Sequence, residues 1–244
     1  MKKLRDENNH QTNNMRIKRL ALRKGVLEAR GITIIIDVFR AFTCEPLLYY
    51  FGVTQIILES DIDTCRAMKG NYICIGENNE VPIEGFDLTN SPSLIMKKGR
   101  DYFKGKKVIH RTTSGVPGAI NAFEHSDEVL LASFVNARAT AEYVKKRNPE
   151  LVSIVAMGAR SKENAIEDDY CGDYIESLLN NKDYDHIKAV FDILSHESAQ
   201  KFLRGDKSYL PKEDPVLCLQ RDIFDFALAA RQQGNLIVSV KCEV

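Results

Sequence analysis

The sequence ITIIIDV at residues 32–38 is the clearest indication of the fold class. Residues 32–36 are apolar apart from Thr33, and such a continuous run is typical of a strand buried on both faces of a sheet. Short runs rich in valine, isoleucine and leucine recur at 55–58, 72–75, 107–110, 128–131, 152–156 and 236–240. Amphipathic segments lie between such runs at 138–147, 169–180 and 222–231. The alternation predicts an α/β fold, with a largely parallel or mixed central sheet covered by helices on both faces.

The composition limits the classes of protein to which the chain can belong. Of its 244 residues, 44% are hydrophobic and 28% are charged, which excludes intrinsic disorder as the main state. The 34 Lys and Arg residues balance 34 Asp and Glu residues, so no net charge attracts nucleic acid or an anionic membrane. No apolar run approaches the roughly 20 residues of a membrane span. We therefore expect neither nucleic acid nor membrane as a partner.

The ends and the cysteines of the chain favour one intracellular domain. Residues 1–14 are polar and lack the apolar core of a secretory signal, which predicts a disordered tail before a single α/β/α domain at 15–244 and a cytoplasmic location. The six cysteines form no CxxC pair, and several lie in apolar runs, which favours reduced thiols in the core. The sequence leaves the oligomeric state open, a homo-oligomer included.

Residues 15–31 are rich in Lys and Arg and allow two interpretations. The segment is either an arm that binds nucleic acid or the solvated face of an element at the edge of the sheet. The zero net charge and the absence of tryptophan favour the edge element.

Polar groups follow the strand predicted at residues 32–38. Asp37 lies at its carboxyl end, which is where open α/β sheets bind ligands. Arg40 comes three residues later, and Thr43 with Pro46 indicates the start of a helix. Carboxylate oxygens suit Mg²⁺, and an arginine beside a helix N-terminus suits phosphate. An Asp37–Arg40 ion pair that closes a turn explains the segment equally well.

Two further segments carry groups of the same kind. Residues 111–115, RTTSG, follow the strand at 107–110 and can bind an anion through hydroxyls and backbone N–H groups, although ordinary helix capping explains them too. Glu167, Asp168 and Asp169 precede an amphipathic helix. Three adjacent acids exceed what the helix dipole requires, which favours a shared Mg²⁺.

The longest irregular stretch, residues 76–93, is predicted to be an ordered loop folded over the site, because four apolar residues interrupt its polar sequence. Its Glu77, Asp87, Asn90 and Ser91 offer polar groups to the same cleft. His110, at the end of a strand, is either a proton-transfer group or a packed histidine, which is the commoner case.

Taken in series, these segments resemble the motifs of a known family, the Mg²⁺-dependent 2-phosphosulfolactate phosphatases of coenzyme M biosynthesis and their bacterial homologues. The resemblance spans about residues 32–179. The motifs are IDVFRAFT (36–43), GE (76–77), GFDLTNSP (85–92), RTTSG (111–115), ASFVNA (132–137) and EDDYC (167–171).

The resemblance implies a three-layer α/β/α fold and Mg²⁺-assisted hydrolysis of a small phosphorylated hydroxy acid, 2-phosphosulfolactate, to sulfolactate and phosphate. A metal-activated water is the simplest mechanism. We expect Asp37, Asp168 and Asp169 to hold Mg²⁺, and Glu77 or Glu167 to orient the attacking water. The residues expected to bind substrate or phosphate are Arg40, Thr43, Asn90, Ser91, Arg111, Thr112, Thr113, Gly115, Ser133 and Asn136.

The chain departs from the family pattern near the expected substrate. Phe42 and Cys44 flank Thr43, Val116 and Pro117 follow the RTTSG segment, and Asp173 replaces a small residue. The alternatives are therefore a phosphatase with a different small phosphorylated acid as substrate, or a non-catalytic homologue that binds anions.

Overall fold

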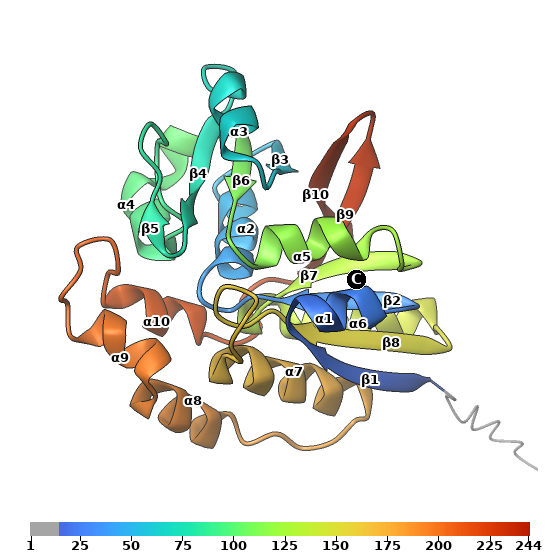
Figure 1. Cartoon of the computed structure of the whole chain (residues 1–244). Coiled ribbons are helices and arrows are strands. Elements are labelled where there is room, and N and C mark those ends of the chain that lie inside the picture. The colour runs from blue at the N-terminus through green and yellow to red at the C-terminus, as the bar shows by residue number, and fades with distance from the viewer. Residues whose placement is uncertain (1–14) are drawn as a thin grey trace, which may run out of the picture.

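The computed structural model describes residues 15–244 and contains a mixed sheet of ten strands in the order β1-β8-β2-β7-β9-β10-β3-β6-β4-β5 (Figure 1). The predicted tail at residues 1–14 lies outside the described residues. The strands are β1 (Arg16–Ala21), β2 (Ile32–Ile36), β3 (Gln55–Leu58), β4 (Ile73–Asn78), β5 (Val81–Pro82), β6 (Lys107–Arg111), β7 (Glu128–Ala132), β8 (Leu151–Ala156), β9 (Phe226–Gln233) and β10 (Leu236–Glu243). All seven strands predicted from the sequence are present.

Helices cover both faces of this sheet, which confirms the α/β fold and its three layers (Figure 1). One face carries α1 (Leu22–Glu28), α2 (Ala41–Tyr50), α4 (Pro92–Phe103) and α5 (Gly115–Ala122). The other carries α3 (Ile62–Met68), α6 (Ala137–Arg147) and α7 (Ile166–Leu179). A short 3₁₀ turn, Phe134–Asn136, precedes α6. Three further helices, α8 (His186–Ser195), α9 (Glu197–Leu203) and α10 (Glu213–Cys218), pack beside α7 and α4.

The core explains the long apolar strands. Ile34, Ile35 and Ile36 alternate between the two helical layers, and all three are fully buried. The sheet is thus covered on both sides, which is why the strands are continuously apolar and do not alternate with polar residues.

A hairpin of β9 and β10 divides the sheet into two parallel halves. β1, β8, β2 and β7 run parallel to one another, as do β3, β6 and β4, and the hairpin joins the halves by antiparallel pairing with β7 and β3. The helix predicted at residues 222–231 is therefore wrong, because most of that segment is strand β9. Residues 227–230 are buried between the two helical layers, so tertiary burial overrides the helix propensity of Ala-Leu-Ala-Ala.

The basic segment at residues 15–31 forms β1 and α1 at one edge of the sheet. β1 pairs in parallel with β8 on one side only. Arg19 pairs with Asp173 at 2.6 Å and with Glu176 at 3.3 Å. This arrangement matches the edge element expected from the sequence.

The cysteines agree with the expectation of thiols in the core. The six cysteines are free thiols, and five of them are buried. Within residues 15–244, no helix is both long and apolar enough to cross a membrane.

Candidate functional site

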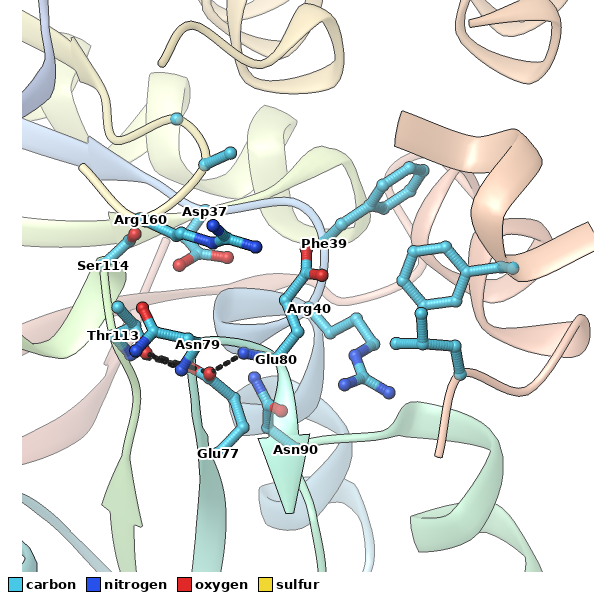
Figure 2. Close-up of a pocket in the computed structure, with 14 residues that line it drawn as sticks. Asp37, Phe39, Arg40, Glu77, Asn79, Glu80, Asn90, Thr113, Ser114 and Arg160 are labelled. Carbon is cyan, nitrogen blue, oxygen red and sulfur yellow. Dashed lines mark hydrogen bonds between the residues drawn. The ribbon is translucent and has the colours of Figure 1, made fainter. Parts of the chain in front are cut away.

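A cavity opens where the two parallel halves of the sheet bring their carboxyl ends together (Figure 2). The ends of β2 and β8 contribute one side, the end of β4 and the turn after β6 contribute the other, and α9 covers it with the loop that follows. Its lining comprises Asp37, Phe39, Arg40, Glu77, Asn79, Glu80, Asn90, Thr113, Ser114, Gly158, Ala159, Arg160, Phe202 and Leu210. Five of the residues expected at the site, Asp37, Arg40, Glu77, Asn90 and Thr113, line this cavity.

Asp37 is fixed at the end of β2 by the starts of two helices. The N–H of Ala41 donates to its Oδ1 at 3.2 Å, and the N–H of Gly115 donates to its Oδ2 at 2.9 Å. Burial is the main cause that raises the pKa of Asp37 to about 6, and the negative charge of Glu77 contributes to that rise. Two carboxylates therefore face one cavity, and a cation between them would relieve their repulsion.

Glu77 holds the turn that follows β6. The N–H of Thr113 donates to Oε1 of Glu77 at 2.6 Å, and the Thr113 hydroxyl donates to Oε2 at 2.9 Å, as the dashed lines in Figure 2 show. Gly76 permits this contact, because a Cβ there would lie 2.1 Å from the carbonyl oxygen of Arg111. Arg111 binds the Glu77 carbonyl and does not line the cavity.

The tip of the β4–β5 hairpin forms the rim of the cavity. Asn79 and Glu80 have φ angles of 51° and 71°, a conformation that is uncommon for side chains other than glycine. The N–H of Glu80 donates to Glu77, and the Glu80 carboxylate forms an ion pair with Lys201 of α9. The stretch predicted as a loop folded over a site thus contains this rim.

Arg40 enters the cavity from the start of α2 and is buried. It pairs with Asp214 of α10 at 2.9 Å rather than with Asp37, and its guanidinium lies 5.4 Å from the ring centroid of Phe202. Asp214 also accepts from the Ser91 hydroxyl at 2.8 Å and from the N–H of Ser93 at 3.0 Å. One buried carboxylate therefore positions both Arg40 and the N-terminus of α4.

The three acids at the start of α7 do not line the cavity. Asp168 accepts from the N–H of Val38 through Oδ1 and from the N–H of Gly158 through Oδ2, both at 2.8 Å, so it ties the ends of β2 and β8 together. Burial raises its pKa well above the usual range. Glu167 is buried, its pKa is raised by burial, and Asp169 is half-buried beside Arg19.

The cavity suits a cation bound through few protein ligands. Across residues 15–244, no group of three or more Asp, Glu, His or Cys side chains is arranged to hold a metal ion. Asp37 and Glu77 nevertheless supply hard oxygen donors, and Mg²⁺ usually binds through one or two carboxylates plus waters and substrate phosphate. The residues present fit that mode of binding, whereas Asp37, Asp168 and Asp169 form no such cluster.

Several hydroxyl and amide groups expected to bind substrate make hydrogen bonds within the protein. Thr43 donates to the Val38 carbonyl, and Ser133 donates to the Phe42 carbonyl, each at 3.0 Å. The Asn136 side chain caps the 3₁₀ turn that begins after Ser133. These residues join α2 to the end of β7.

The remaining expected groups do not line the cavity. The Thr112 hydroxyl accepts from the N–H of Val116 at 2.9 Å, Ser91 caps α4, and Gly115 contacts Asp37. Asp87, also named by the family resemblance, accepts from the N–H of Cys74 at 2.8 Å. Capping, the simpler interpretation of RTTSG, therefore holds for Thr112.

The sequence reasoning missed residues that form part of this region. Asn79, Glu80 and Phe202 line the cavity, and Asp214 positions Arg40. Glu80 and Asn79 lie in a stretch that was expected to contribute, so their polarity was a usable signal. Asp214 and Phe202 lie beyond residue 180, where no motif guided the choice, and only the packing of α9 and α10 shows their position.

Comparison with known proteins identifies the family of the chain. The family described as 2-phosphosulpholactate phosphatase matches residues 20–233. A Bacillus subtilis protein named "Probable 2-phosphosulfolactate phosphatase" is 31% identical over 216 residues, which are 86% of this chain and 91% of that protein. A Methanocaldococcus jannaschii protein named "2-phosphosulfolactate phosphatase" is 32% identical over 172 residues, 68% of this chain and 72% of that protein. With a match over most of its length and with relatives of this similarity, the chain belongs to the 2-phosphosulfolactate phosphatase family.

Proposed function

We propose that the protein is a Mg²⁺-dependent phosphatase that hydrolyses 2-phosphosulfolactate to sulfolactate and phosphate. The observation that carries the proposal is the pairing of two carboxylates, Asp37 and Glu77, with two guanidinium groups, Arg40 and Arg160, in one cavity at the carboxyl edge of the sheet. Such a set binds a divalent cation and a phosphoryl group side by side. Membership of the family supports the choice of substrate.

Asp37 and Glu77 would hold the Mg²⁺. Backbone N–H groups orient both carboxylates, so little rearrangement is needed for binding. When bound, the ion supplies charge neutralisation of the phosphoryl oxygens and a water of lowered pKa.

The side chains of the chain itself bind and orient the reactants. Arg40, held by Asp214 and Phe202, donates to phosphoryl oxygens from a fixed position. Of the two acids considered for the attacking water, Glu77 lines the cavity and Glu167 does not, so Glu77 would orient the water in addition to holding the ion. Phe202 and Leu210 exclude bulk water from one side, which strengthens the electrostatic interactions inside the cavity.

Phosphate release from purified protein tests the proposal. We expect release from 2-phosphosulfolactate with Mg²⁺, none with EDTA, and none from Asp37→Asn. Asp63→Asn, a change in an exposed carboxylate on α3, is the matched control and keeps full activity.

The alternatives give different results in the same assay. Faster release of phosphate from another phosphorylated hydroxy acid would make that compound the substrate in place of 2-phosphosulfolactate. Phosphorylated acids could instead raise the thermal stability of the protein without any release of phosphate. The protein would then be an anion-binding homologue, and the proposal would be wrong.

A further inference from the structure

A second cavity adjoins the first and is much larger. The first has a volume of about 50 Å³ and the second about 320 Å³. The two share Thr113 and Arg160 in their walls, so they meet at the turn after β6 and the loop after β8. The first cavity is the smaller of the two, and a substrate whose phosphoryl group lies there has the second cavity beside it.

The second cavity is cationic. Arg23 of α1 and Arg160 and Lys162 of the loop after β8 line it, and no acidic side chain does. None of these three cations takes part in a salt bridge among residues 15–244. Asn121 and Ser161 add neutral hydrogen-bonding groups. This combination suits an anion that enters from solvent.

The loop that presents Arg160 and Lys162 has a constrained backbone. Gly158, Arg160 and Ser161 have φ angles of 66°, 56° and 55°. A Cβ at Gly158 would lie 2.2 Å from the carbonyl oxygen of Glu163, and the N–H of Gly158 donates to Asp168. Non-glycine residues in this conformation cost free energy and tend to occur at functional sites. The constraint fixes the backbone at Arg160, which lines both cavities, and Figure 2 shows this residue in the wall of the first.

We propose that this second cavity binds the non-phosphorylated anionic group, sulfonate or carboxylate, of the substrate, through Arg23, Lys162 and Arg160. The proposal rests on the proposed function, because it assigns the anionic part of that substrate which is not phosphorylated. It makes the protein selective for phosphomonoesters that carry a second negative charge on the alcohol.

Two substrates that differ in charge test this selectivity. 2-Phosphosulfolactate carries anionic groups beside its phosphorylated carbon, whereas glycerol 2-phosphate carries only neutral hydroxyls there. We expect the double variant Arg23→Gln/Lys162→Gln to lose about tenfold in kcat/KM for 2-phosphosulfolactate, through KM, since it removes two charged hydrogen-bond donors from partly solvated positions. Its activity on glycerol 2-phosphate should stay unchanged.

Lys24→Gln is the matched control. Lys24 is the exposed neighbour of Arg23 on α1 and does not line the cavity, so this variant removes a nearby charge only. It should behave as wild type on both substrates. An equal loss on the two substrates in the double variant, or no loss on either, would overturn the proposal.

A binding measurement separates this proposal from the reaction. Sulfolactate has no phosphate to lose, so its effect on the thermal unfolding midpoint reports anion binding whether or not the protein is a phosphatase. Sulfolactate should stabilise wild type and Lys24→Gln but not the double variant. Absence of stabilisation in wild type, or equal stabilisation in the double variant, would contradict the second site even if phosphate release were observed.

Discussion

Among the acids of the chain, Asp168 shows most directly how one side chain holds the site together. Both its oxygens accept backbone N–H groups, one from each of two strand ends. We expect Asp168→Asn to lower the free energy of unfolding by about 2 kcal/mol, because an amide offers one acceptor oxygen and leaves a buried N–H unpaired. Urea unfolding checks this, with Asp169→Asn as the control that should change stability little. Equal stability of Asp168→Asn and wild type would show that Asp168 does not hold the two strand ends together.

The pKa of Asp37 predicts a pH dependence of stability in metal-free protein. Its pKa in the folded state is about 6, above the usual 3.8, so the folded protein binds the proton more tightly than the unfolded chain. This contribution to stability is complete below pH 3.8 and is lost as the pH rises through about 6.

Thermal unfolding across that pH range in EDTA checks the sign. We expect the difference in midpoint between wild type and Asp37→Asn to shift against wild type as the pH rises. Addition of Mg²⁺ should reduce the loss, because a bound cation favours the charged carboxylate. A difference that is constant with pH would show that Asp37 does not titrate in this range.

For single residues, the sequence predicts which polar groups lie near the site better than it predicts what each of them binds. Asp37 and Glu77 follow strands, and parallel strands bring their carboxyl ends to one edge, so their meeting could be anticipated. Thr43, Ser133 and Asn136 have the same polarity as ligand-binding groups, yet their partners are carbonyls and N–H groups of the protein. The difference depends on a neighbouring element and is not visible in a local pattern.

The N-terminus of α5 controls the position of Asp37. A Cβ at Gly115 would lie 2.8 Å from Oδ2 of Asp37 and 3.1 Å from the ring of Phe42, which is fully buried and cannot yield. We expect Gly115→Ala to destabilise the protein by about 1–3 kcal/mol and to move Asp37. Under the proposed function, kcat falls about tenfold or more while circular dichroism stays native. Full activity with native stability would show that the contact relaxes at little cost.

Elements with a strong pattern could be predicted, and those with ambiguous patterns could not. The strands at 32–36 and 152–156 lie inside the sheet and carry long apolar runs. Such runs are typical of buried strands, so the sequence predicts them well. Residues 226–233 include Ala-Leu-Ala-Ala followed by polar residues, which fits a helix as well as a strand. Only pairing with β7 and β10 decides between the two. Helices α8 to α10 carry no motif, and their packing beside α7 and α4 was not anticipated.

For the whole molecule, the position of the C-terminal hairpin predicts the effect of truncation. β9 pairs with β7, and β10 pairs with β3, so the hairpin is the only link in the sheet between its two halves within residues 15–244. A chain that ends at residue 224 leaves one edge of β7 and one edge of β3 without a hydrogen-bonding partner. We expect it to lose cooperative thermal unfolding and to be cut rapidly by protease. A cooperative transition with native circular dichroism would show that the halves associate without the hairpin.

The same hairpin has a consequence for how the protein is made. A ribosome delivers β9 and β10 after the other eight strands described, although they occupy the middle of the finished sheet. The strands that flank them, β7 and β3, leave the ribosome earlier and must wait without a partner on one side. Contacts between segments so distant in sequence form slowly, and open strand edges are prone to aggregation. Nascent chains of this family member should therefore depend on chaperones until β9 and β10 have emerged.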